Sequence, residues 1–317
     1  MPVSLSAETK NRPSAVLLSL ALALLATGSV FAEGLKPTQR KLQWGIYQDI
    51  WGENRYKRDL EQVARNLEAT PSIVLVFRDL KRGVPKKVIT SQLETTFIIS
   101  LELHEWGRKN GTYLEQITGG EYDAFFRTWA KDAAATGRPI WLRFGFEMSG
   151  QWFSWSGKPE LFRQAWIRVH KIFQEQKATN VKWMFAPNVL YGSQTFTKNI
   201  LPYYPGDAYV DLLGLDGYNF GDNHSKHHRW ETYAEIFEAS IAGMKTFPKP
   251  LWISEIGCAD GPKKSLWLAD FLERAEKDGR VEGFVYFNYD KRSEGEPNWA
   301  LDSDPGTLKV FKDWVKR

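Results

Sequence analysis

Apolar residues along the chain follow two alternating patterns. Short apolar runs, typical of buried strands, alternate with longer segments in which apolar residues recur every three or four positions, as on one face of a helix. The runs predict strands at 42–47, 72–77, 96–101, 140–146, 181–185, 210–215, 251–254 and 281–287. The longer segments predict helices at 56–67, 121–135, 159–176, 230–245, 264–277 and 305–315, with a poor helix at 88–93 and mostly loop between the fifth and sixth strands.

Eight strands that alternate with helices predict an α/β protein built as a closed (β/α)₈ TIM barrel in a single domain, which typically takes about 250 residues. An open dinucleotide-binding sheet would need a glycine-rich turn after its first strand. The first strand instead runs into Trp44-Gly-Ile-Tyr-Gln-Asp-Ile-Trp51, and the chain contains no phosphate-binding loop motif.

The N-terminal segment has the pattern of a secretory signal peptide. Lys10 and Arg12 precede an apolar run at 15–30, and small residues end at Ala32. We therefore expect cleavage after residue 32, a barrel domain at 33–317, and secretion to the periplasm or the medium. An uncleaved membrane anchor is the alternative, because the run is long and leucine-rich; no later segment is apolar enough to span a membrane.

Charge and cysteine content narrow the class of protein. The net charge is +4 and the basic residues are scattered, which argues against nucleic acid as a partner. Cys258 is the single cysteine, so an internal disulfide is excluded and stability must come from core packing. We expect Cys258 to be a buried small residue and the protein to be a monomer, although no sequence feature bears on the oligomeric state.

Tryptophan is the most conspicuous feature of the composition, with 14 residues. Several lie within predicted helices and are expected in the core. Six others lie at or beyond the ends of apolar runs, where flat apolar rings could support the faces of sugars. They are Trp44, Trp51, Trp106, Trp152, Trp155 and Trp299.

Polar side chains collect at the predicted carboxyl ends of the strands, where barrel enzymes place their chemistry. Glu147 follows the fourth strand and Glu255 ends the seventh, and these strands lie across the barrel mouth from each other. Two carboxylates that flank one bond are what glycoside hydrolysis requires. The alternative is a structural ion pair, for instance Glu255 with Arg143, which by strand alternation points to the same side as Glu147.

These residues lie in motifs that resemble glycoside hydrolase family 26, a (β/α)₈ family of retaining endo-acting enzymes that are mostly β-mannanases, with some β-glucanases and β-1,3-xylanases. The motifs span residues 44–299 in the family's order. They are Arg143 to Trp155 (RFGFEMSGQWFSW), Trp183 to Asn188 (WMFAPN), Tyr204 to Asp211 leading to Gly-Leu-Asp-Gly-Tyr218, Ile253-Ser-Glu255-Ile-Gly, and Phe287-Asn-Tyr-Asp-Lys291 followed by Trp299.

The resemblance implies a role for each matching residue. Glu147 would be the acid/base, Glu255 the nucleophile and Tyr218 the phenol beside it, while Trp152 and Trp155 would be sugar platforms. The sequence departs from the family at Phe146, where the family has a histidine, and at Ser149, where it has an asparagine. Phenylalanine cannot donate a hydrogen bond to a sugar, so a β-glucan with 1,3 or 1,4 links competes with mannan as the substrate.

The remaining predictions concern substrate binding. The polysaccharide or oligosaccharide is expected to contact Arg143, Trp152, Trp155, Asn188, Tyr218, Glu102, His104, Trp44 and Trp299. No cofactor or metal is expected; His224, His227 and His228 could hold zinc by their spacing, but no cysteine or carboxylate accompanies them and Lys226 adds positive charge. Two further alternatives are a non-catalytic polysaccharide-binding barrel and a transglycosylase or trimming enzyme that acts on an exported polysaccharide.

Overall fold

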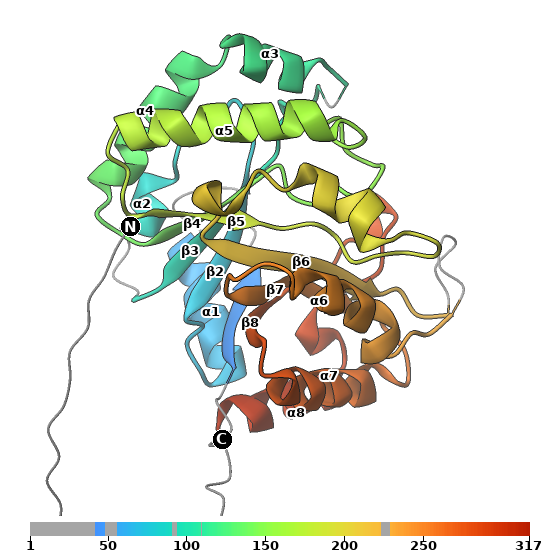
Figure 1. The fold of residues 1–317 in the computed structure, drawn as a ribbon. Coiled ribbons are helices and arrows are strands. Elements are labelled where there is room, and N and C mark those ends of the chain that lie inside the picture. The colour runs from blue at the N-terminus through green and yellow to red at the C-terminus, as the bar shows by residue number, and fades with distance from the viewer. Residues whose placement is uncertain (1–41, 48–55, 91–93, 109, 223–228) are drawn as a thin grey trace, which may run out of the picture. The chain divides into compact units, whose positions relative to one another are not determined.

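Eight parallel strands close into a barrel in which each strand pairs with its neighbours in sequence and β1 also pairs with β8 (Figure 1). The computed structural model describes residues 42–47, 56–90, 94–108, 110–222 and 229–317. The strands are β1 (Gln43–Tyr47), β2 (Ile73–Arg78), β3 (Thr96–Leu101), β4 (Ile140–Phe144), β5 (Val181–Phe185), β6 (Leu212–Asn219), β7 (Leu251–Cys258) and β8 (Val281–Tyr286). The predicted (β/α)₈ barrel is thereby confirmed.

Helices connect the strands and cover the outside of the barrel (Figure 1). The α-helices are α1 (Tyr56–Leu67), α2 (Lys86–Ile89), α3 (Tyr113–Gly119), α4 (Asp123–Ala135), α5 (Pro159–Glu175), α6 (Ala239–Met244), α7 (Lys264–Asp278) and α8 (Pro305–Val315). Short 3₁₀ or π turns are η1 (Phe196–Ile200), η2 (Leu201–Tyr203), η3 (Asp207–Tyr209), η4 (Ala234–Glu238), η5 (Arg292–Glu294) and η6 (Leu301–Ser303).

Four elements differ clearly from the sequence prediction. The short helix α3 is additional, the helix expected at 230–245 is a π turn that continues into α6, and β6 and β7 each run four residues beyond their predicted ends. All eight residues of β7 are buried, so its glutamate lies within the strand and does not end it. None of the helices in the described ranges is long and apolar enough to cross a membrane, and the predicted signal segment lies outside those ranges.

The core has two layers because successive side chains of a strand point to opposite faces. Leu75, Ile98 and Met184 fill the barrel, whereas Val74 and Ile99 pack outward in the cluster between the sheet and the helices. Side chains near the carboxyl ends of the strands therefore either enter the barrel mouth or lie beneath the helices. This division decides which predicted residues can meet a ligand.

A buried lysine fastens two connections at the barrel mouth. Lys264, the first residue of α7, is fully buried, and its Nζ donates to Asp260 Oδ1 at 2.9 Å, Ala300 O at 2.8 Å and Ser303 Oγ at 2.8 Å. The ammonium therefore ties the β7–α7 connection to the segment after β8. That segment includes Trp299.

We predict that Lys264→Met lowers the free energy of unfolding by about 2 kcal/mol, because the carbonyl oxygens of Asn298 and Ala300 lose the buried ammonium as their donor. Lys263→Met is the matched control: Lys263 is its exposed neighbour and should change stability by less than about 0.5 kcal/mol. Urea unfolding of the three proteins measures the difference. Equal stability of the two variants would contradict the structural role of Lys264.

Candidate active site

Glu147 and Glu255 both lie at the barrel mouth, one in a loop and the other within a strand. Glu255 lies in β7, whereas Glu147 lies three residues beyond the end of β4. Glu147 has a φ of 52°, a left-handed conformation that is uncommon outside glycine, and its N–H donates to Ala186 O at 2.8 Å. Such backbone strain persists only where the surrounding structure fixes it, and it is concentrated at functional sites.

Gly145 makes the turn before Glu147 possible. Its φ is 58°, and a Cβ at this position would lie 2.7 Å from Leu103 Cδ1 and 2.8 Å from Phe162 Cε2. Only glycine meets both demands. The chain can therefore leave β4 sharply and turn the Glu147 side chain back over the mouth.

The mouth holds three carboxylates. One oxygen each from Glu147, Asp216 and Glu255 lies within 4.8 Å of the other two. In glycosidases, carboxyl groups about 5–5.5 Å apart act with retention, and groups about 6.5–9.5 Å apart act with inversion. The spacing of Glu147 and Glu255 thus lies on the retaining side.

Arg143 supplies the cation of this cluster. It is fully buried, and its Nη1 donates to Glu255 Oε1 at 2.6 Å and to Ser100 Oγ at 2.8 Å, while its Nη2 donates to Asp216. Strand alternation on β4 directs Arg143 into the barrel, beneath the carboxylates. The guanidinium is covered by its own carboxylate partners, so in this structure it supports the site from beneath and does not line it.

Tyr218 completes the surroundings of Glu255. Its hydroxyl donates to Glu255 Oε2 at 2.5 Å, so both oxygens of Glu255 are engaged. Burial, together with the nearby carboxylates, raises the pKa of Tyr218 well above its usual value, and the phenol therefore remains a donor. The structure places Tyr218 beside Glu255, as predicted.

The environment of Glu147 favours its protonated form. Desolvation by burial, followed by the charge of Glu255, raises the pKa of Glu147 to about 7. A hydrogen bond from Trp152 Nε1 to Glu147 Oε2, 2.7 Å long, and the charges of Arg143 and Lys291 oppose this rise. Glu147 can therefore carry a proton near neutral pH, while Glu255 is paired with a cation.

Asp216 is the member of the carboxylate cluster to which the sequence analysis assigned no role. It is buried on β6 and accepts from Ser254 Oγ at 2.6 Å as well as from Arg143. Burial raises its pKa. Asp216 lies in the Gly-Leu-Asp-Gly-Tyr run at the carboxyl end of a strand, so the rule that identified Glu147 could have identified it too.

Of the tryptophans predicted to support sugars that lie in the described ranges, Trp152 is exposed, Trp106 is partly exposed and three are buried. Trp152 is 54% exposed beside Glu147. Trp155 is fully buried, stacks on Phe153 with centroids 4.2 Å apart and donates to Phe146 O, so it supports the site from below. The described structure leaves none of the Trp155 ring accessible, so its predicted contact with a sugar is not seen there.

Trp299 and Trp44 are also buried. Trp299 is 1% exposed and packs on Tyr218 at a centroid distance of 4.8 Å, so it positions the phenol. Trp44 points outward from β1 against Phe311 of α8, at 5.2 Å, and lies outside the barrel mouth. Neither ring is available to a substrate in this structure. Trp51 and the three clustered histidines lie outside the described residues.

The other polar residues predicted to contact substrate have different positions: Asn188 joins two loops, and His104 and Glu102 follow β3. Asn188 is buried; it accepts from Ser149 Oγ at 2.6 Å and donates to Val189 O, so it joins the two loops after β4 and β5. The Asn188 side chain thus bonds within the protein, and its predicted contact with a sugar is not seen in this structure. His104 is buried and stacks on Trp155 at 5.5 Å, whereas Glu102 remains partly exposed and accepts from Trp106 Nε1.

Aromatic carbon surrounds the carboxylates. Phe146 is 4% exposed and lies 5.3 Å from both Phe77 and Phe153, with the Arg143 guanidinium carbon 4.8 Å from its ring centre. Phenylalanine in this position offers a sugar no hydrogen-bond donor. The mouth is therefore apolar where the resembling family has a histidine.

Comparison with known proteins agrees with this geometry. The family model described as glycosyl hydrolase family 26 matches residues 118–270. Endoglucanase H of Acetivibrio thermocellus is 30% identical over 208 residues, which are 63% of this chain and 22% of that protein. Mannan endo-1,4-beta-mannosidase A and B of Caldalkalibacillus mannanilyticus is 26% identical over 181 residues, 53% of this chain and 30% of that protein. The chain thus spans less than a third of each of these two relatives.

Solved structures show the same fold. The catalytic domain of the Bacillus sp. JAMB-750 GH26 endo-beta-1,4-mannanase superimposes with a TM-score of 0.67 at 16% identity, covering 88% of this chain and 86% of that one. The GH26 beta-mannanase of Bacteroides ovatus gives 0.64 at 18% identity, covering 87% and 89%. The motifs, the barrel and these comparisons agree, and the chain is similar to glycosyl hydrolase family 26 over residues 118–270.

Proposed function

We propose that this protein is a secreted glycoside hydrolase that cleaves β-linked polysaccharide internally and with retention of configuration. The observation that carries the proposal is the pair of glutamates: they lie within 4.8 Å of each other, and their surroundings differ. Glu147 is desolvated and has a pKa of about 7, whereas Glu255 is bonded to Arg143 and Tyr218. An acid and a nucleophile need these two different environments.

The reaction would proceed in two displacements. Glu147 gives its proton to the glycosidic oxygen as Glu255 attacks the anomeric carbon, so that the leaving sugar departs and a glycosyl ester forms on Glu255. Glu147, now ionised, takes a proton from water, and the water oxygen attacks the same carbon and releases Glu255. Arg143 stabilises the carboxylate that is restored, and the indole of Trp152 orients Glu147.

We favour a β-1,4-linked or mixed-linkage glucan over mannan as substrate. The apolar side chain of Phe146 supports this choice, and so does the 30% identity with a protein named as an endoglucanase. Trp152, exposed beside the acid, provides the flat surface against which a sugar ring could stack.

Secretion rests on the N-terminal pattern of residues 1–32. N-terminal sequencing of the exported protein should begin at Glu33. An intact N-terminus on a membrane-bound protein would favour the anchor instead.

We predict that Glu147→Gln and Glu255→Gln each lower kcat/KM by roughly 10³-fold or more, since each removes a group that acts in the transition state. Glu160→Gln is the matched control, because Glu160 is an exposed glutamate on α5 and the change should leave activity intact. Hydrolysis is measured on mixed-linkage glucan, laminarin, mannan and xylan.

The same measurements separate the two alternative functions. If the unaltered protein binds one of these polymers and hydrolyses none, the non-catalytic alternative replaces this proposal. A high yield of coupled products at high acceptor concentration would favour the transglycosylase.

The pH profile tests the acid. Because protonated Glu147 is required, kcat/KM should fall as pH rises through about 7. The Trp152 hydrogen bond lowers the pKa of Glu147, so Trp152→Phe should move this alkaline limb to higher pH. A limb that stays in place or moves to lower pH in Trp152→Phe would show that another group controls it.

We predict that Phe146→His shifts specificity toward mannan. A histidine can donate a hydrogen bond to the bound sugar, and one such bond contributes about 1 kcal/mol, or roughly fivefold, to the ratio of kcat/KM on mannan to that on glucan. Phe146→Leu, which keeps the site apolar, should leave the ratio near its original value. An unchanged ratio in a folded Phe146→His protein would rule out control of sugar preference by this position.

A further inference from the structure

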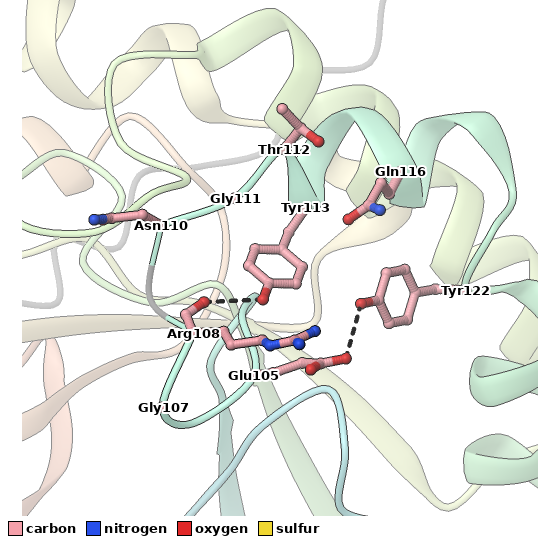
Figure 2. Close-up of a pocket in the computed structure, with 9 residues that line it drawn as sticks. All are labelled: Glu105, Gly107, Arg108, Asn110, Gly111, Thr112, Tyr113, Gln116 and Tyr122. Carbon is pink, nitrogen blue, oxygen red and sulfur yellow. Dashed lines mark hydrogen bonds between the residues drawn. The ribbon is translucent and has the colours of Figure 1, made fainter.

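A second concave site lies between the loop after β3 and helices α3 and α4 (Figure 2). It has a volume of about 590 Å³, within the range of pockets that hold small ligands. Its walls include the side chains of Glu105, Arg108, Tyr113, Gln116 and Tyr122. None of these residues belongs to the carboxylate cluster described above.

One turn separates this pocket from the catalytic mouth. Arg108 N–H donates to Glu105 O at 2.8 Å and Gly107 has a φ of 88°, which makes residues 105–108 a glycine-dependent turn. Glu105 and Arg108 line the pocket, while Trp106 between them donates its indole N–H to Glu102 at the rim of the mouth. The turn is therefore shared by both sites.

Two tyrosines form aromatic walls of the pocket (Figure 2). The Tyr113 hydroxyl donates to Arg108 O at 2.9 Å, and the Tyr122 hydroxyl contacts Glu105 Oε1 at 3.5 Å. The two ring centres are 6.4 Å apart at an angle of 55°. Burial, with the charge of Glu105, raises the pKa of Tyr122 to about 12, so its phenol keeps its proton at neutral pH.

The polar groups of the pocket form a donor next to an acceptor. Figure 2 shows the Arg108 guanidinium beside the Glu105 carboxylate and the Tyr122 hydroxyl. Glu105 Oε2 is buried and forms an ion pair with Lys81 Nζ at 3.1 Å, whereas Glu105 Oε1 has, among the described residues, only the long contact with Tyr122. Arg108 makes no ion pair or side-chain hydrogen bond within the described ranges. The Arg108 guanidinium therefore keeps its donors for a ligand, and Glu105 Oε1 supplies an acceptor beside it.

We propose that this pocket binds a neutral sugar unit of the polysaccharide outside the catalytic mouth. A sugar hydroxyl both donates and accepts, which matches a guanidinium beside a carboxylate, and tyrosine rings suit the apolar faces of a pyranose. The Glu105 carboxylate lines the pocket and would repel an acidic ring, which favours a neutral one. The choice of ligand rests on the proposed function; the pocket itself does not.

A second contact with the same polymer would strengthen binding, because a polymer held in the mouth has a high effective concentration at the pocket. A chain held in both the mouth and the pocket dissociates more slowly than one held in the mouth alone. Removal of the pocket should therefore weaken binding of long polymers while short oligosaccharides, which fill only the mouth, are bound and cleaved as before.

The test is affinity electrophoresis through soluble mixed-linkage glucan and through galactomannan, with the full chain carrying Glu255→Gln so that the polymer stays intact. Whichever of the two polymers retards the parent protein, Arg108→Ala should weaken that retardation about fivefold or more. Arg274→Ala, an exposed arginine on α7, is the matched control and should leave retardation unchanged. Arg108→Lys, which keeps the charge but loses the planar fork, should fall between.

The outcomes separate this proposal from the catalytic one. If Arg108→Ala is retarded as strongly as the parent protein, the proposal that this pocket binds a sugar unit is overturned, whether or not the enzyme is active. Retardation by alginate alone, lost in Arg108→Ala, overturns the assignment to neutral sugars. Loss in Arg108→Ala of retardation by glucan or galactomannan supports the pocket even if the unaltered protein hydrolyses no polysaccharide, in which case only the proposed activity fails.

Discussion

The buried guanidinium of Arg143 is the interaction on which the site depends. It joins three strands besides its own, because it donates to Ser100 on β3, Asp216 on β6 and Glu255 on β7. Burying a charge is expensive unless partners and hydrogen bonds compensate, and the removal of one partner leaves the others uncompensated. The same contacts that compensate the charge of Arg143 in the barrel therefore fix the position of Glu255.

The carboxylates outnumber the cation, and this imbalance gives the site its chemistry. Three carboxylates lie within 4.8 Å of one another while one guanidinium bonds to two of them. Glu147, which makes no bond to Arg143, is the one whose pKa rises to about 7. The proposed division into an acid and a nucleophile thus rests on which glutamate Arg143 bonds to, and Glu147 is the one without such a bond.

Aromatic residues supply the rigidity that this arrangement needs. Trp155 bonds to the backbone of Phe146, directly before Glu147, and Trp299 packs on Tyr218, which bonds to Glu255. Lys264 in turn fastens the segment that carries Trp299. The two glutamates are therefore held through buried rings, and the exposed indole of Trp152 is left for a ligand.

The sequence predicted the barrel and both glutamates because each depends on a local pattern: strand–helix alternation and a carboxylate in or after an apolar strand. It could not predict which tryptophans are exposed. Trp44, Trp155 and Trp299 have flanking residues much like those of Trp152, and only the direction of each side chain in the closed barrel distinguishes them. The short helix α3 was missed because its seven residues are too few to show periodicity, and β7 was cut short because Glu255 interrupts its apolar run.

The central claim is that Glu255 attacks the anomeric carbon while Glu147 acts from the opposite side of the bond. The most direct measurement is proton NMR of the first product released from a β-linked oligosaccharide, recorded before the anomers equilibrate. The two-displacement account predicts that the new reducing end appears first as the β-anomer. An α-anomer formed first would mean that water attacks directly, and it would contradict the role assigned to Glu255.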